Sequence, residues 1–141
     1  MKLPDVNVLV HAGNPQAAQH RRARAWLVEA GNGREALALP WIVLLGFIRL
    51  STRAGIYARP LPVAQAMSSV RHWLAAPAAM VVQPGPQHLD ILTALLTRIG
   101  TAGNLTTDAH IAAVAVEHGA TVVSFDRDFA RFDGVPFELL A

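Results

Sequence analysis

Short apolar stretches alternate with longer helical patterns along the whole chain, and this alternation constrains the fold more than any other feature. Stretches typical of strands occupy residues 2–10, 36–39, 80–82, 121–125 and 135–139. Proline stands near the start of several intervening segments and glycine after the end of several, as at helix boundaries. Short strands joined by helices are typical of a parallel sheet covered by helices. The sequence therefore predicts an α/β fold with a short central parallel sheet of four to five strands.

The segments between these strands predict helices at about residues 15–30, 41–53, 62–76, 84–99 and 105–118. The segment 41–53 is apolar nearly all round, which favours a buried helix. Apolar residues make up 52% of the 141-residue chain, so there is enough material for a core. No linker and no internal repeat interrupts the pattern, and we expect one domain over residues 1–141.

Several classes of protein are excluded or disfavoured by composition. The chain has no cysteine, which excludes disulfides, thiolate metal sites and cysteine nucleophiles and fits a reducing compartment. The longest apolar run, residues 36–48, stops at Arg49 before it reaches the length of a membrane-spanning helix. No long apolar segment follows Lys2, so no secretory signal is expected. We expect a cytoplasmic protein that does not associate with a membrane.

The charge balance is nearly even, at +2 with neutral histidines. All but one of the twelve basic residues are arginine, whose planar guanidinium can donate two hydrogen bonds to one phosphate. They cluster at residues 21–24 and again at Arg49, Arg53 and Arg59. Clusters of this kind suit a phosphate-bearing ligand, but they are equally typical of solvated helix faces, so charge alone does not decide.

Four aspartates stand where chemistry is expected. Asp5 lies within the first strand pattern, and Asn7, two residues on, would point to the same side of a strand. Asp108 falls on the apolar, sheet-facing stripe of the last predicted helix. Asp126 and Asp128 follow the strand 121–125 directly. Each acid taken alone is also compatible with a structural role, such as capping a helix or complementing its dipole.

Together these acids indicate a cation site, because ligands of an open parallel sheet bind beyond the carboxyl ends of its strands. Crowded carboxylates repel one another, and a divalent cation relieves the repulsion. Oxygen ligands without cysteine favour Mg²⁺ or Mn²⁺. The six histidines form no paired metal motif, and we interpret them as surface or structural residues. Such an ion completes its shell with substrate phosphate, which implies hydrolysis of a phosphodiester or a phosphomonoester.

Four segments, in this order, resemble the PIN-domain ribonucleases of the VapC toxin type. They are Asp5-Val6-Asn7-Val8-Leu9, the segment 45–53, Asp108-Ala109-His110-Ile111-Ala112-Ala113, and Ser124-Phe125-Asp126-Arg127-Asp128-Phe129. The resemblance runs from residue 3 to about 137. It implies a PIN-like α/β sandwich and an endoribonuclease that depends on Mg²⁺ or Mn²⁺ and acts as the toxin of a toxin–antitoxin pair. It further implies a small antitoxin partner and a homodimer.

The resemblance also implies roles for individual residues. The acids of the family match Asp5, Asp108 and Asp126 as metal ligands and catalytic residues, with Asp128 as a further catalytic candidate. Its serine or threonine near the last acid matches Ser124, which is expected to contact the substrate. Beside these, Asn7 is expected to help position the substrate and Arg49 or Arg53 to contact its phosphates. The chain departs from the family at Gly46, where a glutamate is often found, and this predicts weaker metal binding or one ion instead of two.

Two other functions stay open at this point. A catalytically degenerate module of the same fold would bind RNA or protein without cutting, with Gly46 marking the lost acid. A phosphatase would use Asp5 as its nucleophile, although such sites generally want a second aspartate where this chain has Asn7. Three tryptophans and the apolar segments 41–53 and 60–73 are compatible with a protein interface as well as with core packing.

Overall fold

A five-stranded parallel sheet forms the centre of the computed structural model, which describes all of residues 1–141. Its strand order is β3-β2-β1-β4-β5, and every neighbouring pair is parallel. The strands are β1 (Lys2–Pro4), β2 (Leu37–Ala38), β3 (Ala79–Met80), β4 (Thr121–Ser124) and β5 (Phe137–Leu139). The predicted α/β architecture with a short parallel sheet is confirmed. Because β1 and β4 are adjacent, the segments that follow them leave the same edge of the sheet side by side.

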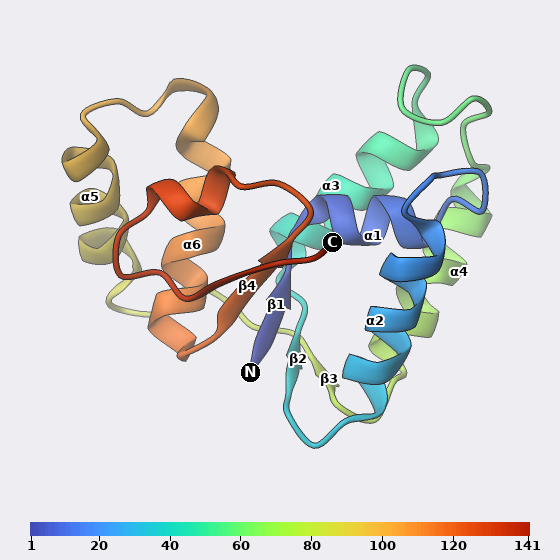
Figure 1. Cartoon of the computed structure of the whole chain (residues 1–141), viewed down its shortest axis with the longest axis horizontal. Helices are drawn as coiled ribbons and strands as arrows, with labels where there is room; N and C mark the ends of the chain where they lie inside the picture. Colours follow the sequence, from blue (N-terminus) through green and yellow to red (C-terminus); the bar gives the residue numbers. More distant parts are fainter.

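Six α-helices and two short 3₁₀ helices cover this sheet in two groups. The α-helices are α1 (Val6–Ala12), α2 (His20–Asn32), α3 (Trp41–Thr52), α4 (Val63–Leu74), α5 (His88–Ile99) and α6 (Thr106–His118). The 3₁₀ helices are η1 (Gly103–Leu105) and η2 (Asp128–Arg131). Figure 1 shows α5 and α6 packed as one lobe and α1 to α4 as the other, with the sheet between them.

The first predicted strand is wrong beyond its third residue. It was expected to span residues 2–10, but β1 ends at Pro4 and α1 begins at Val6. Asp5 caps this helix by accepting the backbone N–H of Val6 at 2.7 Å, which is a common role for aspartate. The apolar run that suggested a strand is buried as a helix instead, and a short buried helix and a buried strand have the same run of apolar residues.

Most helix positions were predicted, but two starts were wrong. The first long helix begins at His20 and not near Pro15, and α5 begins at His88 and not near Pro84. The helix over 41–53 is confirmed as α3, yet it is not buried on every side. Its Val43, Leu44 and Phe47 side chains are inaccessible, whereas other apolar side chains of α3 are exposed.

One continuous core of 31 buried apolar residues joins both faces of the sheet. Helix α1 lies close to α3 because Gly46 has no side chain. A Cβ atom there would stand 2.8 Å from Cγ2 of Val6, the residue that follows Asp5. Gly46 therefore sets how closely α3 approaches the start of α1. None of the helices has both the length and the apolar character required to span a membrane.

Candidate functional site

Asp5 lies at the carboxyl end of the central strand, and its backbone N–H and both carboxylate oxygens form hydrogen bonds. Its backbone N–H donates to the carbonyl of Val123 at 2.8 Å, as a continuation of the β1–β4 pairing. One carboxylate oxygen accepts from Val6 N–H, and the other accepts from Ser124 Oγ at 2.8 Å. The side chain is only 8% exposed. These contacts fix an acidic group at the edge of the sheet in one orientation.

Asn7, Ser124 and Asp126 extend this network across the sheet edge. The Asn7 amide donates to Ser124 Oγ at 2.9 Å and to Asp126 Oδ2 at 3.2 Å, and its oxygen accepts from the backbone N–H of Phe125. Ser124 Oγ also accepts from the Asp126 N–H at 3.0 Å. The hydroxyl thus donates once and accepts twice, which is its full capacity. The network ties the end of β4 to α1.

Asn7 reaches this network by a different route from the one predicted. It was expected to share a strand face with Asp5, but it lies in the first turn of α1, and Asp5 is the residue that caps the helix. Both side chains nevertheless point to the end of β4, where Ser124 contacts both. The two side chains therefore meet at Ser124, but the strand from which they were expected to point together is wrong.

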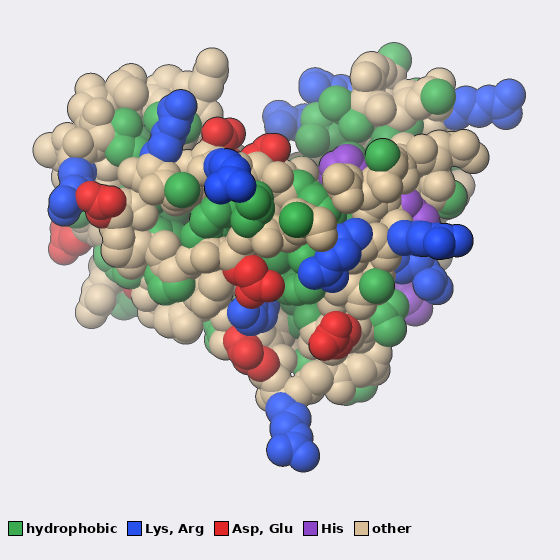
Figure 2. Space-filling model, viewed as in Figure 1, with side chains coloured by type: hydrophobic (Ala, Val, Ile, Leu, Met, Phe, Trp, Pro, Cys, Tyr) green, Lys and Arg blue, Asp and Glu red, His purple; other side chains and the backbone are tan.

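Asp108 comes to the same place from the other lobe. It lies in the first turn of α6, half-buried, where the helix dipole favours an anion. Asp5, Asp108 and Asp126 all line one pocket of about 760 Å³, which we call the acidic pocket. Its remaining lining comes mainly from α1 and α3 and includes His11, Gly46 and Arg49. In Figure 2 acidic side chains are visible at the hollow between the two lobes.

The other predicted site residues lie around this pocket. Asp128 is exposed in η2 and does not line the pocket, but its charge acts on Asp108. Ser124 is fully buried beneath it and acts through its hydrogen bonds. Arg53 follows the end of α3 and is outside the lining, so the structure favours Arg49 over Arg53 as the basic residue of the pocket.

Burial and mutual repulsion perturb the acids of the pocket. Burial raises the pKa of Asp5 to about 6, although the hydrogen bonds from Ser124 and Val6 oppose the shift, and the charges of Asp108 and Asp126 add to it. The pKa of Asp108 is also raised, chiefly by burial and then by the charges of Asp128 and Asp126. The three ion pairs of the structure are Met1–Glu35, Lys2–Glu138 and Arg98–Asp133, so none of the acids of the pocket is paired with a cation.

These carboxylates fit a hydrated divalent cation better than a fully dehydrated one. No three aspartate, glutamate or histidine side chains come close enough together to hold one ion directly among them. Magnesium commonly keeps several of its waters and takes only one or two carboxylates. A buried carboxylate without a cationic partner, facing two further acids across a pocket, suits that mode of binding.

His11 is a pocket residue that the sequence interpretation missed, since all six histidines were taken as surface or structural. It lies four residues after Asn7 in α1 and therefore on the same helix face. The spacing was visible in the sequence, but it indicates a shared face only when the segment is a helix. Burial lowers the pKa of His11, and the charge of Asp126 opposes that shift.

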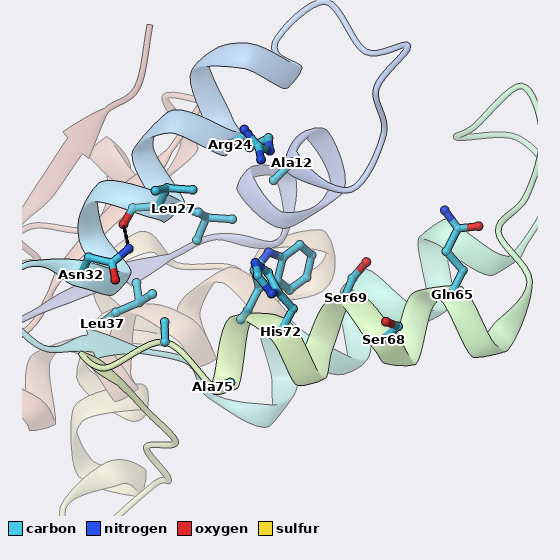
Figure 3. A pocket seen from close by; sticks show the side chains of 13 residues that line it. Ala12, Arg24, Leu27, Asn32, Leu37, Gln65, Ser68, Ser69, His72 and Ala75 are labelled. Carbon is cyan, nitrogen blue, oxygen red and sulfur yellow. Dashed lines mark hydrogen bonds between the residues drawn. The ribbon is translucent and has the colours of Figure 1, made fainter.

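A second pocket of about 520 Å³ lies between α2 and α4 and contains no acidic side chain. Figure 3 shows Arg24 and Leu27 from α2 facing His72, Ser69 and Gln65 from α4. It belongs to the lobe of α1 to α4 and holds none of the four aspartates. The acids thus single out the acidic pocket as the candidate site.

Comparisons with known proteins show the family to which the chain belongs. The PIN domain family model matches residues 2–135. Ribonuclease VapC37 of Mycobacterium tuberculosis is 46% identical over 138 residues, which cover 98% of this chain and 96% of that protein. Ribonuclease VapC33 of the same species is 45% identical over 132 residues, covering 94% of this chain and 92% of that protein.

Solved structures show the same fold at lower identity. VapBC2 from Rickettsia felis, bound to a DNA fragment from their promoter, superposes with a TM-score of 0.71 at 19% identity, over 99% of this chain and 98% of that one. Mycobacterium tuberculosis VapC20, a sarcin-ricin loop cleaving toxin, gives 0.69 at 18% identity, over 92% and 93% of the two chains. With a family model over nearly its whole length and relatives this similar, the chain belongs to the PIN domain family and, within it, to the VapC group.

Proposed function

We propose that this chain, acting as one domain over residues 1–141, is a divalent-metal-dependent endoribonuclease and the toxin of a toxin–antitoxin pair. The observation that carries the proposal is the acidic pocket, where Asp5, Asp108 and Asp126 converge from separate elements and none of them forms an ion pair. Membership of the VapC group supports hydrolysis of RNA as the reaction.

Asp5, Asp108 and Asp126 would hold the ion, which we propose to be Mg²⁺ or Mn²⁺, partly through water molecules. When bound, such an ion lowers the pKa of a coordinated water and neutralises charge that develops on the phosphoryl group. Asp128, whose charge acts on Asp108, is the proposed acceptor of a proton from water. Asn7 and Ser124 keep Asp5 and Asp126 oriented through the hydrogen bonds described above.

Arg49 and Arg53 are the proposed phosphate contacts. Arg49 lines the acidic pocket, and its guanidinium forms no ion pair in the structure. Arg53 follows directly after α3, so it would meet a neighbouring phosphate of a bound strand outside the pocket. A basic residue beside an acidic metal site lets a polyanion approach carboxylates that would otherwise repel it.

The decisive experiment is cleavage of total cellular RNA by purified protein with Mg²⁺, with Mn²⁺ and with EDTA. Asp108→Asn is expected to abolish cleavage, because it removes one acid of the pocket. Asp90→Asn is the matched control, since Asp90 occupies the third residue of α5 as Asp108 does of α6, but lies outside the pocket. Equal cleavage by the two variants, or cleavage that persists in EDTA, would reject the metal-dependent nuclease.

A non-catalytic module of the same fold is the alternative that a specific observation favours. Gly46 stands where the family often has an acid, and no three potential ligands are close enough to bind an ion directly. Such a module would bind RNA without cutting it in either metal. The cleavage experiment separates the two, and the mapped sites identify the preferred RNA.

The proposed protein partners are a small antitoxin and a second copy of the chain. The antitoxin is inferred from the VapBC assemblies that share the fold. For the homodimer, the exposed side chains of Trp41 and Leu45 on α3 and of Val63 and Met67 on α4 offer apolar surface of the kind that interfaces cover. Light scattering by the purified chain tests the dimer, which is expected at twice 15.1 kDa.

A further inference from the structure

The ring of His11 lies in the acidic pocket and takes no part in the hydrogen-bond network there. Helix α1 brings three groups to this wall in succession: Asp5 at its cap, Asn7 in its first turn and His11 in its last. Asp5 accepts from Val6 and Ser124 and keeps acceptor sites only for a cation, while Asn7 donates to Ser124 and Asp126. The His11 ring is therefore the group on this face of α1 whose nitrogens make no hydrogen bond within the protein and can donate to an anionic ligand.

Packing holds the His11 ring in place. The ring meets that of Phe125 edge-on, with centroids 5.1 Å apart and an angle of 76° between the planes. Phe125 is itself fixed, because its backbone N–H donates to Asn7. The ring of His20 bonds the backbone carbonyl of His11 and not its side chain. The orientation of the imidazole thus depends on packing, and neither ring nitrogen is used to stabilise the fold.

An imidazole at this position lowers the stability of the fold, so its presence indicates a role in function. The Nδ1 atom of His11 is buried and has no hydrogen-bond partner. A buried polar atom left unpaired costs about 1–3 kcal/mol, and a phenylalanine ring would pack against Phe125 without that cost. A neutral imidazole carries one N–H, and buried donors without an acceptor are rarer than buried acceptors without a donor. The proton is therefore placed on Nε2, which is left to donate.

We infer that His11 is a substrate-binding residue whose Nε2–H donates a hydrogen bond to a phosphate oxygen of the RNA strand in the acidic pocket. The inference rests on the proposed function, since RNA is the ligand. A further donor suits this pocket, because its three acids repel phosphate and Arg49 is its only arginine. A hydrogen bond to an anionic oxygen also needs no charged partner on the protein. The contact would add affinity for the RNA backbone without preference for a base.

The test compares His11→Phe and His11→Gln with the wild-type chain on a fluorescein-labelled, mixed-sequence single-stranded RNA. His11→Phe keeps the ring packing and removes the donor, whereas His11→Gln restores an N–H at similar reach. We expect His11→Phe to raise KM about tenfold with little change in kcat, as the loss of a contact made in both ground and transition state requires. His11→Gln should bring KM most of the way back to the wild-type value. The melting temperature of His11→Phe should equal or exceed that of the wild type.

His88→Phe is the matched control, because His88 also has a buried Nδ1 without a partner but lies outside the acidic pocket. Its KM should match that of the wild type. A further readout separates a neutral donor from a cation: Arg49→Gln should lessen the salt dependence of RNA binding by about 0.7 in the log–log slope, whereas His11→Phe should leave the slope unchanged.

Unchanged KM in His11→Phe, or a parallel loss of melting temperature that His11→Gln does not rescue, would show that the ring only packs. Equilibrium binding of the same RNA, followed by fluorescence polarisation, covers the case of a wild-type chain that does not cleave. A wild-type chain that does not cleave RNA rejects the proposed reaction. Weaker RNA binding by His11→Phe than by the wild type would then still support the contact of His11 with phosphate. A wild-type chain that neither cleaves nor binds RNA rejects both.

Discussion

Asp5 stabilises the fold through its hydrogen bonds and destabilises it through its buried charge. As the cap of α1 it satisfies the N–H of Val6, and as an acceptor from Ser124 it fixes the end of β4. Its carboxylate is nevertheless buried without a cationic partner, and this burial raises its pKa to about 6. A capping asparagine would accept from the N–H of Val6 without a charge, although it would lose the bond from Ser124. The charge is therefore retained at the expense of stability, which is typical of functional sites.

This conflict predicts that Asp5→Asn stabilises the metal-free protein at neutral pH. Between pH 3.8 and about 6 the folded state holds a proton on Asp5 that the unfolded state has lost, so the free energy of unfolding falls as the pH rises through this window. Above this window the ionised Asp5 lowers the free energy of unfolding by about 3 kcal/mol relative to a protein with an unshifted pKa. In EDTA at pH 7, Asp5→Asn should exceed the wild type in unfolding free energy by up to that amount.

Urea denaturation at several pH values measures the difference, which should shrink towards zero near pH 4. Glu29→Gln, the loss of an exposed acid on α2, serves as the control and should show no comparable gain at pH 7. If Asp5→Asn is less stable than the wild type at pH 7, the cap and the Ser124 contact outweigh the buried charge.

At the scale of elements, the position of the site was easier to predict than the local structure of its first residues. Asp108 and Asp126 could be placed because a parallel crossover brings the start of α6 and the end of β4 to one edge of the sheet. Residues 5–10 could not, because an apolar run of this length suits a strand and a short buried helix equally. His11 was missed for that reason, since only a helix places it beside Asn7.

The close approach of α1 and α3 predicts an unusual response to Gly46→Ala. Alanine is favoured over glycine in a helix by about 1 kcal/mol, but its Cβ would press on Val6, whose branched side chain has little freedom to move. Overpacking costs about 1–3 kcal/mol, so a net loss of about 1 kcal/mol in unfolding free energy is expected. In a Val6→Ala background the same change should become stabilising.

Denaturation of the two single variants and the double variant gives this comparison directly. A reversal of sign between the two backgrounds assigns the effect to the contact between Gly46 and Val6. If Gly46→Ala lowers the unfolding free energy equally in the wild-type and Val6→Ala backgrounds, the strain lies elsewhere in α3. The result also shows whether the glutamate often found at this position in the family could fit against α1 without moving it.

Tyr57 links the segment after α3 to the end of α1 through a hydrogen bond. Its hydroxyl donates to the carbonyl of Val10 at 2.6 Å and is buried, which raises the pKa of Tyr57 to about 12 and keeps the donor protonated. Val10 lies in the last turn of α1, where carbonyls lack helical partners. Tyr57→Phe leaves this carbonyl unpaired and should lower the unfolding free energy by about 1–3 kcal/mol, measured in urea. Unchanged stability would mean that water replaces the hydroxyl.

At the scale of the whole molecule, the acidic pocket joins the two lobes. Asp5 and Asp126 stand at the ends of β1 and β4, whereas Asp108 begins α6 in the other lobe. The net charge of +2 hides this local concentration of acids, because Arg49 is the only arginine or lysine that lines the pocket. The convergence was predictable from sheet topology. The burial of Asp5 and the absence of a compensating cation were not, since both depend on side-chain packing.

Mg²⁺ is expected to stabilise the folded chain through these acids in a pH-dependent way. A ligand at 100 times its Kd adds about 2.7 kcal/mol to stability. Because an acid is missing at Gly46, we expect a rise in melting temperature only at millimolar Mg²⁺. Asp108→Asn should lose the rise and Asp90→Asn should keep it.

The pH dependence identifies the ligand. Protons and Mg²⁺ compete for Asp5, whose pKa is raised to about 6, so the Mg²⁺-induced shift should be large at pH 7.5 and small at pH 5. In Asp5→Asn it should be absent at both. A shift of equal size at the two pH values would place the ion on other acids, and a flat melting temperature in millimolar Mg²⁺ would favour the non-catalytic module. A stabilising ion that bridges both lobes would also explain why the fold tolerates a buried, unpaired carboxylate at its centre.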